Sequence, residues 1–301
     1  MAFSPEGNLL GSASGDETFR LWDVATGHVI STEKVRSGSF TSRPWVWTVA
    51  FSPEDMMVAS VLNLKDVQIT KILTGATKLF SGHVDSVLCV AFSSSRNIVA
   101  TASTDKTVRL WSVAKGSLLQ TIIAHTDWVR CVAFSDGDLM MASGSDDHTI
   151  QIWHLKKNDI GEISTDRESG LLSTLIGHQS AIRTLVFSHN LKFLASASED
   201  WSIRLWNIYD RRAIKILNGH TGTVRCLSFT TDDRLLVSAS EDKTIRVWDL
   251  ATRTPQILVG HTAWVTSLAF SPGDKILASA SRDNTIKLWD FDSLRRLRVN
   301  E

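Results

Sequence analysis

Short runs in which apolar and polar residues alternate fill the chain, and turn-forming residues separate them. Runs such as VLCVAF, IVATAS and TVRLW are followed by SPEG-like, SxD or TG segments. Because successive side chains of a strand point to opposite faces, such runs predict β-strands of about five residues. No helical period of useful length is present. The pattern therefore predicts an all-β protein.

One pattern recurs along the whole chain. The segments LASASEDWSIRLWN, LVSASEDKTIRVWD and LASASRDNTIKLWD share it, and LGSASGDETFRLWD, IVATASTDKTVRLWS and MASGSDDHTIQIWH follow it closely. Its tryptophans are Trp22, Trp111, Trp153, Trp206, Trp248 and Trp289. The interval between Trp22 and Trp111 has room for one more unit, in which Thr70 takes the tryptophan position. The repeat predicts one domain, 1–301, of seven four-stranded units at about 1–36, 37–80, 81–122, 123–175, 176–217, 218–258 and 259–301.

An upstream half completes the repeat, with segments such as GHVDSVLCVAFS, GHTGTVRCLSFT and GHTAWVTSLAFS. The GH dipeptide, the SAS strand and the WD dipeptide resemble the WD-repeat (Trp-Asp repeat) family over nearly the whole chain. The resemblance implies a seven-bladed β-propeller of four-stranded antiparallel blades. The near-identical repeats are also similar to the arrays of fungal or bacterial NTPase-type signalling proteins, which implies a ligand-sensing module of a larger signalling protein as an alternative function.

Five units contain a His and an Asp 22 residues apart. In the family, a Ser or Thr of the second strand and the Trp of the third strand complete a hydrogen-bonded chain with this pair. The resemblance assigns this structural role to His83, Thr101, Asp105 and Trp111; His125, Ser143, Asp147 and Trp153; His178, Ser196, Asp200 and Trp206; His220, Ser238, Asp242 and Trp248; and His261, Ser279, Asp283 and Trp289. Buried imidazole and indole nitrogens need such partners.

A hydrolytic Ser-His-Asp triad is the catalytic alternative for these residues. An enzyme needs one pre-organised site, whereas this set recurs five times at the same spacing, so we expect no enzymatic activity. The cysteines Cys89, Cys131 and Cys226 occupy the same repeat position, which favours small buried strand residues over metal ligands. No phosphate-binding or redox motif is present, and we expect no cofactor and no metal.

Two units depart from the repeat. The second has Ser42, Leu64 and Thr70 where His, Asp and Trp are expected, so it should be a degenerate and soft blade. The first begins close to its first turn, so its innermost strand is incomplete, and 291–301 aligns with the fourth strand of other units. We expect either an imperfect seam between blades one and seven or a longer natural protein. Two polar insertions, 31–44 and 156–170, are functional loops or tolerated insertions.

Tryptophans outside the WD position mark a candidate binding surface. We call it the His/Asp face, because it consists of the turns that carry the five His/Asp pairs. Side-chain alternation directs one set of residues to this face, around the central channel: Trp45, Trp47, Trp128, Arg130, Arg183, Trp201, Arg225, Glu241, Trp264 and Arg282. Exposed Trp and Arg are frequent among energetic hot spots, so we predict a scaffold that binds peptide segments or partner domains there. The structural alternative is that these tryptophans seal blade edges.

Composition narrows the classes of partner. Lys plus Arg equals Asp plus Glu at 32 each, so the net charge does not attract nucleic acid or an anionic membrane. Nucleic-acid binding through Arg130, Arg183 and Arg225 is an alternative function. Three cysteines without a CxxC pair fit a reducing compartment. No signal peptide or membrane-spanning run is evident. We expect a cytoplasmic or nuclear protein that is part of a larger protein or complex, with other proteins as partners.

Overall fold

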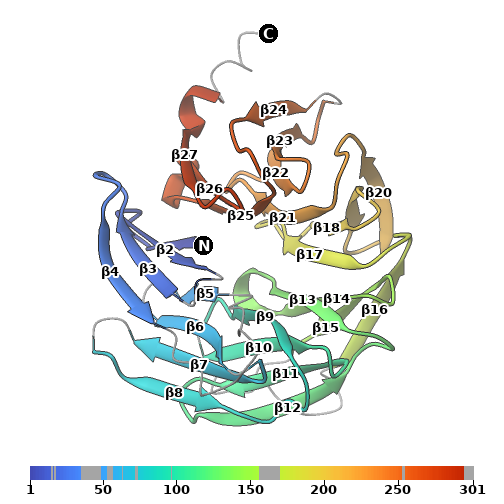
Figure 1. The fold of residues 1–301 in the computed structure, drawn as a ribbon. Coiled ribbons are helices and arrows are strands. Elements are labelled where there is room, and N and C mark those ends of the chain that lie inside the picture. Colours follow the sequence, from blue (N-terminus) through green and yellow to red (C-terminus); the bar gives the residue numbers. More distant parts are fainter. Residues whose placement is uncertain are drawn as a thin grey trace.

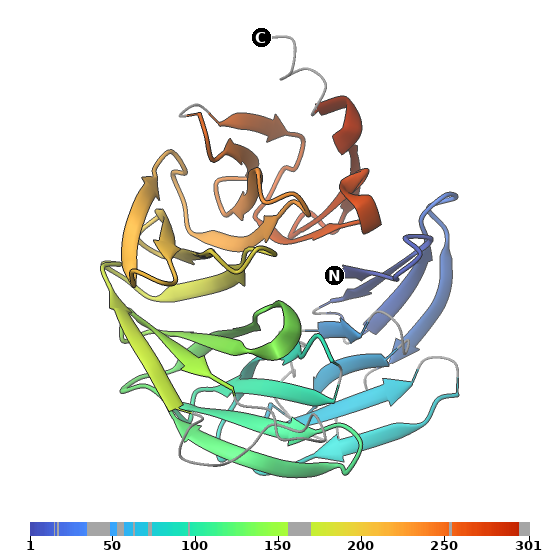
Figure 2. The same ribbon diagram turned by 180° about the vertical axis from the view of Figure 1, so that it is seen from behind.

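The computed structural model describes residues 1–14, 16, 18–34, 49–52, 57–62, 64–71, 74–95, 97–155, 170–252 and 255–294. Seven antiparallel sheets are arranged around a common axis, with their innermost strands at the centre (Figure 1). The view from behind shows the same ring, with the N-terminus near the axis (Figure 2). The all-β seven-bladed propeller expected from the repeat is therefore confirmed.

Each blade runs from its innermost to its outermost strand in chain order. Blade one contains β1 (Ala2–Phe3), β2 (Leu9–Ala13), β3 (Thr18–Asp23) and β4 (Val29–Lys34). Blade two contains β5 (Val49–Ser52), β6 (Met57–Leu62), β7 (Asp66–Lys71) and β8 (Thr77–Phe80). Blade three contains β9 (Val87–Phe92), β10 (Ile98–Ser103), β11 (Thr107–Ser112) and β12 (Ser117–Ile123). Blade four contains β13 (Val129–Phe134), β14 (Met140–Ser145), β15 (Thr149–His154) and β16 (Gly170–Ile176).

The remaining blades repeat this order. Blade five contains β17 (Ile182–Phe187), β18 (Phe193–Ser198), β19 (Ile203–Asn207) and β20 (Arg212–Leu217). Blade six contains β21 (Val224–Phe229), β22 (Leu235–Ser240), β23 (Thr244–Asp249) and β24 (Gln256–Val259). Blade seven contains β25 (Val265–Phe270), β26 (Ile276–Ser281) and β27 (Ile286–Asp290). Short 3-10 turns, η1 (Asp136–Asp138) and η2 (Pro272–Asp274), follow two innermost strands.

The hydrophobic core is divided into layers between neighbouring blades. Each layer combines the second and third strands of one blade with the first strands of the next, as in the cluster of Leu110, Val132 and Met141 between blades three and four. Both faces of a radial sheet are covered, which explains why strands such as β10 and β22 are buried along their whole length. Burial of these layers from water is the main force that holds the ring together.

Loop aspartates add polar links between blades on the face opposite the His/Asp face. Asp138 of blade four accepts hydrogen bonds from the backbone N–H groups of Ser94 at 2.5 Å and Ser95 at 2.8 Å in blade three. Asp233 and Asp274 contact the preceding blade in the same way. These links fix neighbouring blades to each other at their turns.

The seam between blades seven and one differs from the other six. The incomplete first blade is confirmed, because β1 has only two residues. Leu288 in blade seven is 45% exposed, whereas Leu110 at the same position of blade three is fully buried. Of 291–301, the segment aligned with the fourth strand of other units, residues 291–294 are helical and 295–301 lie outside the described residues. Most of both polar insertions also lies outside them.

Candidate functional site

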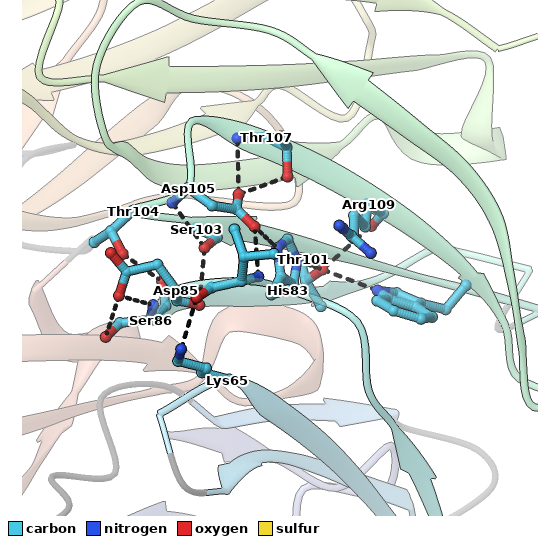
Figure 3. A network of polar contacts seen from close by, with 12 residues as sticks. Lys65, His83, Asp85, Ser86, Thr101, Ser103, Thr104, Asp105, Thr107 and Arg109 are labelled. Atoms are coloured by element: carbon cyan, nitrogen blue, oxygen red, sulfur yellow. Dashed lines mark hydrogen bonds and ion pairs between the residues drawn. The ribbon is translucent and has the colours of Figure 1, made fainter.

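The polar residues of each full repeat form a continuous hydrogen-bonded chain, which Figure 3 shows for blade three. His83 Nδ1 lies 2.7 Å from Asp105 Oδ2, and His83 Nε2 lies 2.6 Å from Thr101 Oγ1. Trp111 Nε1 donates to the same Oγ1 at 2.9 Å. The Thr101 hydroxyl accepts from the indole, which can only donate, and its own hydrogen lies within reach of the Arg109 carbonyl at 3.4 Å as well as of Nε2. Both imidazole nitrogens of His83 therefore have a polar partner.

The same geometry is present in four further blades. Across all five, His Nδ1 to Asp Oδ2 distances are 2.7–2.9 Å, His Nε2 to hydroxyl distances are 2.6–2.8 Å, and indole to hydroxyl distances are 2.8–3.3 Å. The hydroxyl groups involved are fully buried. The participating sets are His125, Ser143, Asp147 and Trp153; His178, Ser196, Asp200 and Trp206; His220, Ser238, Asp242 and Trp248; and His261, Ser279, Asp283 and Trp289.

Each repeat Asp has a further partner that the sequence analysis missed. The hydroxyl two residues later donates to Oδ1 at 2.6–2.7 Å, as from Thr107 to Asp105. The signal was present in the sequence, since a Thr or Ser follows every repeat Asp at this distance. Partial burial disfavours the charged carboxylate, but hydrogen bonds from this hydroxyl and from the imidazole outweigh it. They hold the pKa of each repeat Asp well below its ordinary value.

Blades one and two have only parts of this chain. In blade one, Trp22 Nε1 donates to Ser12 Oγ at 2.7 Å, and Arg20 donates to Asp16 at 2.7 Å. In blade two, Thr70 accepts a hydrogen bond from the neighbouring Gln68 side chain at 3.1 Å. Ser42 lies outside the described residues.

The His/Asp face carries exposed indoles and guanidinium groups. Trp128 is 44% exposed, and the Arg130 guanidinium carbon lies over its ring at 4.8 Å from the centroid. Arg130 also donates twice to Asp146, at 2.7 Å and 2.6 Å. Trp201 is 53% exposed and has a φ of 67°, a left-handed conformation that is unusual for so large a side chain. Trp45 and Trp47 lie outside the described residues.

Arginine–carboxylate pairs recur around the same face. Arg183 pairs with Glu199, and Arg225 pairs with Glu241, with one of its two contacts at 2.7 Å. In blade seven the arrangement changes, because two guanidinium groups lie over the ring of Trp264. The Arg225 carbon is 5.5 Å and the Arg282 carbon 4.2 Å from the indole centroid. The structure thus brings together Arg225, Glu241, Trp264 and Arg282 from blades six and seven.

A cavity of about 430 Å³ lies near the axis, at the end of the innermost strands away from the His/Asp face. Phenylalanines at one repeat position line it, together with the turns that follow them: Phe3, Phe134, Phe187, Phe229 and Phe270. Of the predicted binding residues that the structure describes, none contributes to its wall. In the described part of the chain, no group of three or more His, Cys, Asp or Glu side chains could hold a metal ion. The helices of that part are also too short and polar to cross a membrane.

Comparison with known proteins identifies the repeat. A sequence model described as "WD domain, G-beta repeat" matches residues 1–23, 75–112, 116–154, 169–207, 211–249 and 253–290. The chain belongs to the WD-repeat family. The six matched WD repeats omit the second unit, the one in which Thr70 replaces the tryptophan. The family assignment made from the GH, SAS and WD segments is thereby confirmed.

Several curated relatives match this chain over only part of their own length. It is 28% identical over 224 residues to "Nuclear distribution protein PAC1" of Coccidioides posadasii, a match that covers 67% of this chain and 35% of the relative. "Protein tipD" of Dictyostelium discoideum is 33% identical over 40% of this chain and 19% of the relative. "Guanine nucleotide-binding protein subunit beta" of Oryza sativa subsp. indica is 30% identical over 36% of this chain and 30% of the relative. The chain thus spans about a third or less of these relatives.

Proposed function

We propose that this WD-repeat propeller is a non-catalytic scaffold that binds peptide segments or partner domains of other proteins on its His/Asp face, around the central channel. The observation that carries the proposal is the group of exposed and partly exposed indoles on that face with guanidinium groups over their rings. The Arg130 guanidinium lies over exposed Trp128, and those of Arg225 and Arg282 lie over partly exposed Trp264. Trp and Arg are the residue types most often found as energetic hot spots of protein interfaces.

The framework below these residues favours binding without a large ordering cost. The backbone N–H of Asp146 donates to the carbonyl of Trp128 at 3.0 Å, and that of Arg282 donates to the carbonyl of Trp264 at 2.9 Å. Each tryptophan is therefore held by a turn that the buried polar chain also fixes. A pre-organised side chain loses less conformational entropy on binding, which leaves more of the contact energy for affinity.

The buried chain also supports a non-catalytic role for the Ser, His and Asp residues. Both imidazole nitrogens of His220 have partners, and the Ser238 hydroxyl accepts from Trp248 while it faces His220. A nucleophile must be accessible to substrate, and Ser238 has no exposed surface. The same holds in all five full repeats, so we propose that these groups brace the turns.

Charge pairing favours protein over nucleic acid as the partner. A nucleic-acid-binding protein would use Arg130, Arg183 and Arg225 for contacts with phosphates. Each of them is paired with a carboxylate instead. Nucleic-acid binding depends on several uncompensated cations that displace counterions. We propose that the protein acts in the cytosol or nucleus, within a larger protein or complex, and that it needs no cofactor.

Affinity capture with and without the proposed contacts tests this function. A variant with Trp128→Ala, Arg225→Ala and Trp264→Ala should lose captured proteins identified by mass spectrometry, while its melting temperature falls by only a few degrees, because the three side chains lie outside the buried layers. The control variant carries Leu171→Ala, Ile214→Ala and Ile257→Ala, which remove three exposed apolar side chains from the outermost strands. An unchanged set of captured proteins in the first variant would remove the His/Asp face from consideration.

A further inference from the structure

Blade seven departs from a charge pattern that blades four, five and six share on the His/Asp face. In blades four, five and six, the fifth residue after the repeat His is Arg and the residue before the repeat Asp is acidic. The two side chains pair within each blade. In blade seven Thr266 stands at the Arg position and Arg282 at the acidic position. The pair found in blades four to six is therefore missing, and Arg282 has no carboxylate partner within this pattern. Among the described residues, no ion pair involves Arg282.

The unpaired cation is nevertheless held in place. Arg282 lies over the Trp264 ring, and its backbone N–H bonds to the Trp264 carbonyl. Arg225 flanks the same ring and is already neutralised by Glu241. Arg282 is exposed, whereas Trp264 is only partly buried. A guanidinium that packs its flat face against an indole keeps its N–H edge available for two parallel hydrogen bonds to an oxyanion.

From this arrangement we propose that Arg225, Trp264 and Arg282, here named the Trp264 cluster, bind the side-chain carboxylate of an Asp or Glu in a partner polypeptide. Arg282 donates to the carboxylate, and Trp264 contacts the apolar part of the same segment. The cluster has one uncompensated positive charge, which a carboxylate balances and a phosphate dianion exceeds. The inference rests on the proposed function, because it names the partner chemistry for one part of that face.

A paired peptide library tests the proposal. The probes are fluorescein-labelled peptides in which every glutamate-containing member has a glutamine twin and a phosphoserine twin. Binding to the whole protein is measured by fluorescence anisotropy. We expect the bound glutamate members to exceed their glutamine twins about three- to tenfold in affinity, the range between an exposed ion pair and a charge-assisted hydrogen bond. Arg282→Gln should reduce this ratio to near one.

Two variants separate charge from folding. Arg212→Gln removes one exposed cation from the outermost strand β20, outside the predicted binding residues, and should keep the ratio. Thr266→Arg with Arg282→Glu gives blade seven the pair found in blade six, and it should abolish the glutamate preference with little change in melting temperature. Both outcomes follow from the position of the uncompensated charge, and a merely structural role for Arg282 would not produce them.

Failure of this inference differs from failure of the proposed function. If peptides bind through Trp128 and Trp264 but show no glutamate preference, or one that Arg282→Gln leaves intact, the carboxylate site is wrong and the binding face stands. If phosphoserine members bind more tightly than glutamate members through Arg282, the assignment of a carboxylate is wrong. If no peptide binding responds to changes on the His/Asp face, both proposals are wrong.

Discussion

The substitution Ser238→Ala tests whether the buried polar chain braces the fold. Ser238 Oγ lies 2.7 Å from His220 Nε2 and accepts from Trp248 Nε1 at 2.8 Å. The substitution removes the partner of His220 Nε2 and of Trp248 Nε1, and both His220 and Trp248 are almost completely buried. An unsatisfied buried polar group costs about 1–3 kcal/mol, so the loss of two partners should destabilise the protein by about 3 kcal/mol in all. For a chain of this length, that lowers the melting temperature by roughly 5 °C.

Two controls make the prediction specific, and urea unfolding followed by tryptophan fluorescence measures all three variants. Ser238→Thr keeps the hydroxyl, and blade three already has Thr101 at this position with both hydrogen bonds, so the cost should stay below about 1.5 kcal/mol. Ser12→Ala in blade one removes a hydroxyl that serves only Trp22 and is partly exposed, so it should cost about 1 kcal/mol. An equal cost for Ser238→Ala and Ser12→Ala would refute the bracing role of the imidazole.

Two further predictions concern packing and pH. A Cβ added at Gly144 would lie 2.6 Å from Cγ2 of Ile182, so Gly144→Ala should cost about 1–3 kcal/mol by thermal unfolding. Ile182→Val keeps this methyl but shortens the side chain and gives the combination found at Ala197 and Val224, so the double variant should recover part of the loss. The fold lowers the pKa of Asp242 and the other repeat carboxylates, so the stability they add is present above about pH 4 and lost below it, and burial lowers the pKa of His220, so its contribution is lost as pH falls below about 6.5. The urea midpoint should therefore decline gently below about pH 6.5 and steeply below about pH 4. A midpoint that stays constant in acid would contradict these pKa shifts.

Residues that recur in every unit were predictable from the sequence. The spacing of His and Asp implies that both lie in turns at one end of a blade, and family resemblance supplies the hydroxyl and indole that complete the chain. Leu64 and Thr70 stand where the repeat has Asp and Trp, and blade two still forms four strands, because Met57, Val67 and Ile69 keep its faces apolar. Apolar alternation is therefore sufficient for a strand, whereas the polar chain is not required in every blade.

Pairings between individual side chains, and contacts that join two units, were not predictable in the same way. Arg130, Arg225 and Glu241 were predicted on the same face, but their pairing was not, because it depends on the register of adjacent strands and on side-chain rotamers. The link from Asp138 to the preceding blade was missed, since it joins residues of two repeats and the equivalent position in blade five is Leu191. The periodicity of a single sequence shows which residues recur in every unit. It gives no signal for a contact that joins one unit to the next.

The strict and the variable positions of the repeat have different physical tasks. The His and the Ser or Thr of each full unit are buried, and the Asp and Trp are at least partly buried, so an unsatisfied polar atom is costly there and few alternatives satisfy all the hydrogen bonds. The residues next to them on the His/Asp face are partly exposed, and their exchange costs little stability. Blade seven shows the consequence, because Arg282 replaces an acid while Asp283, the next residue, keeps its hydrogen bond to His261. A new charge pattern can therefore appear on the binding face without disturbing the turn that presents it, and such departures from the repeat are where partner specificity should be sought.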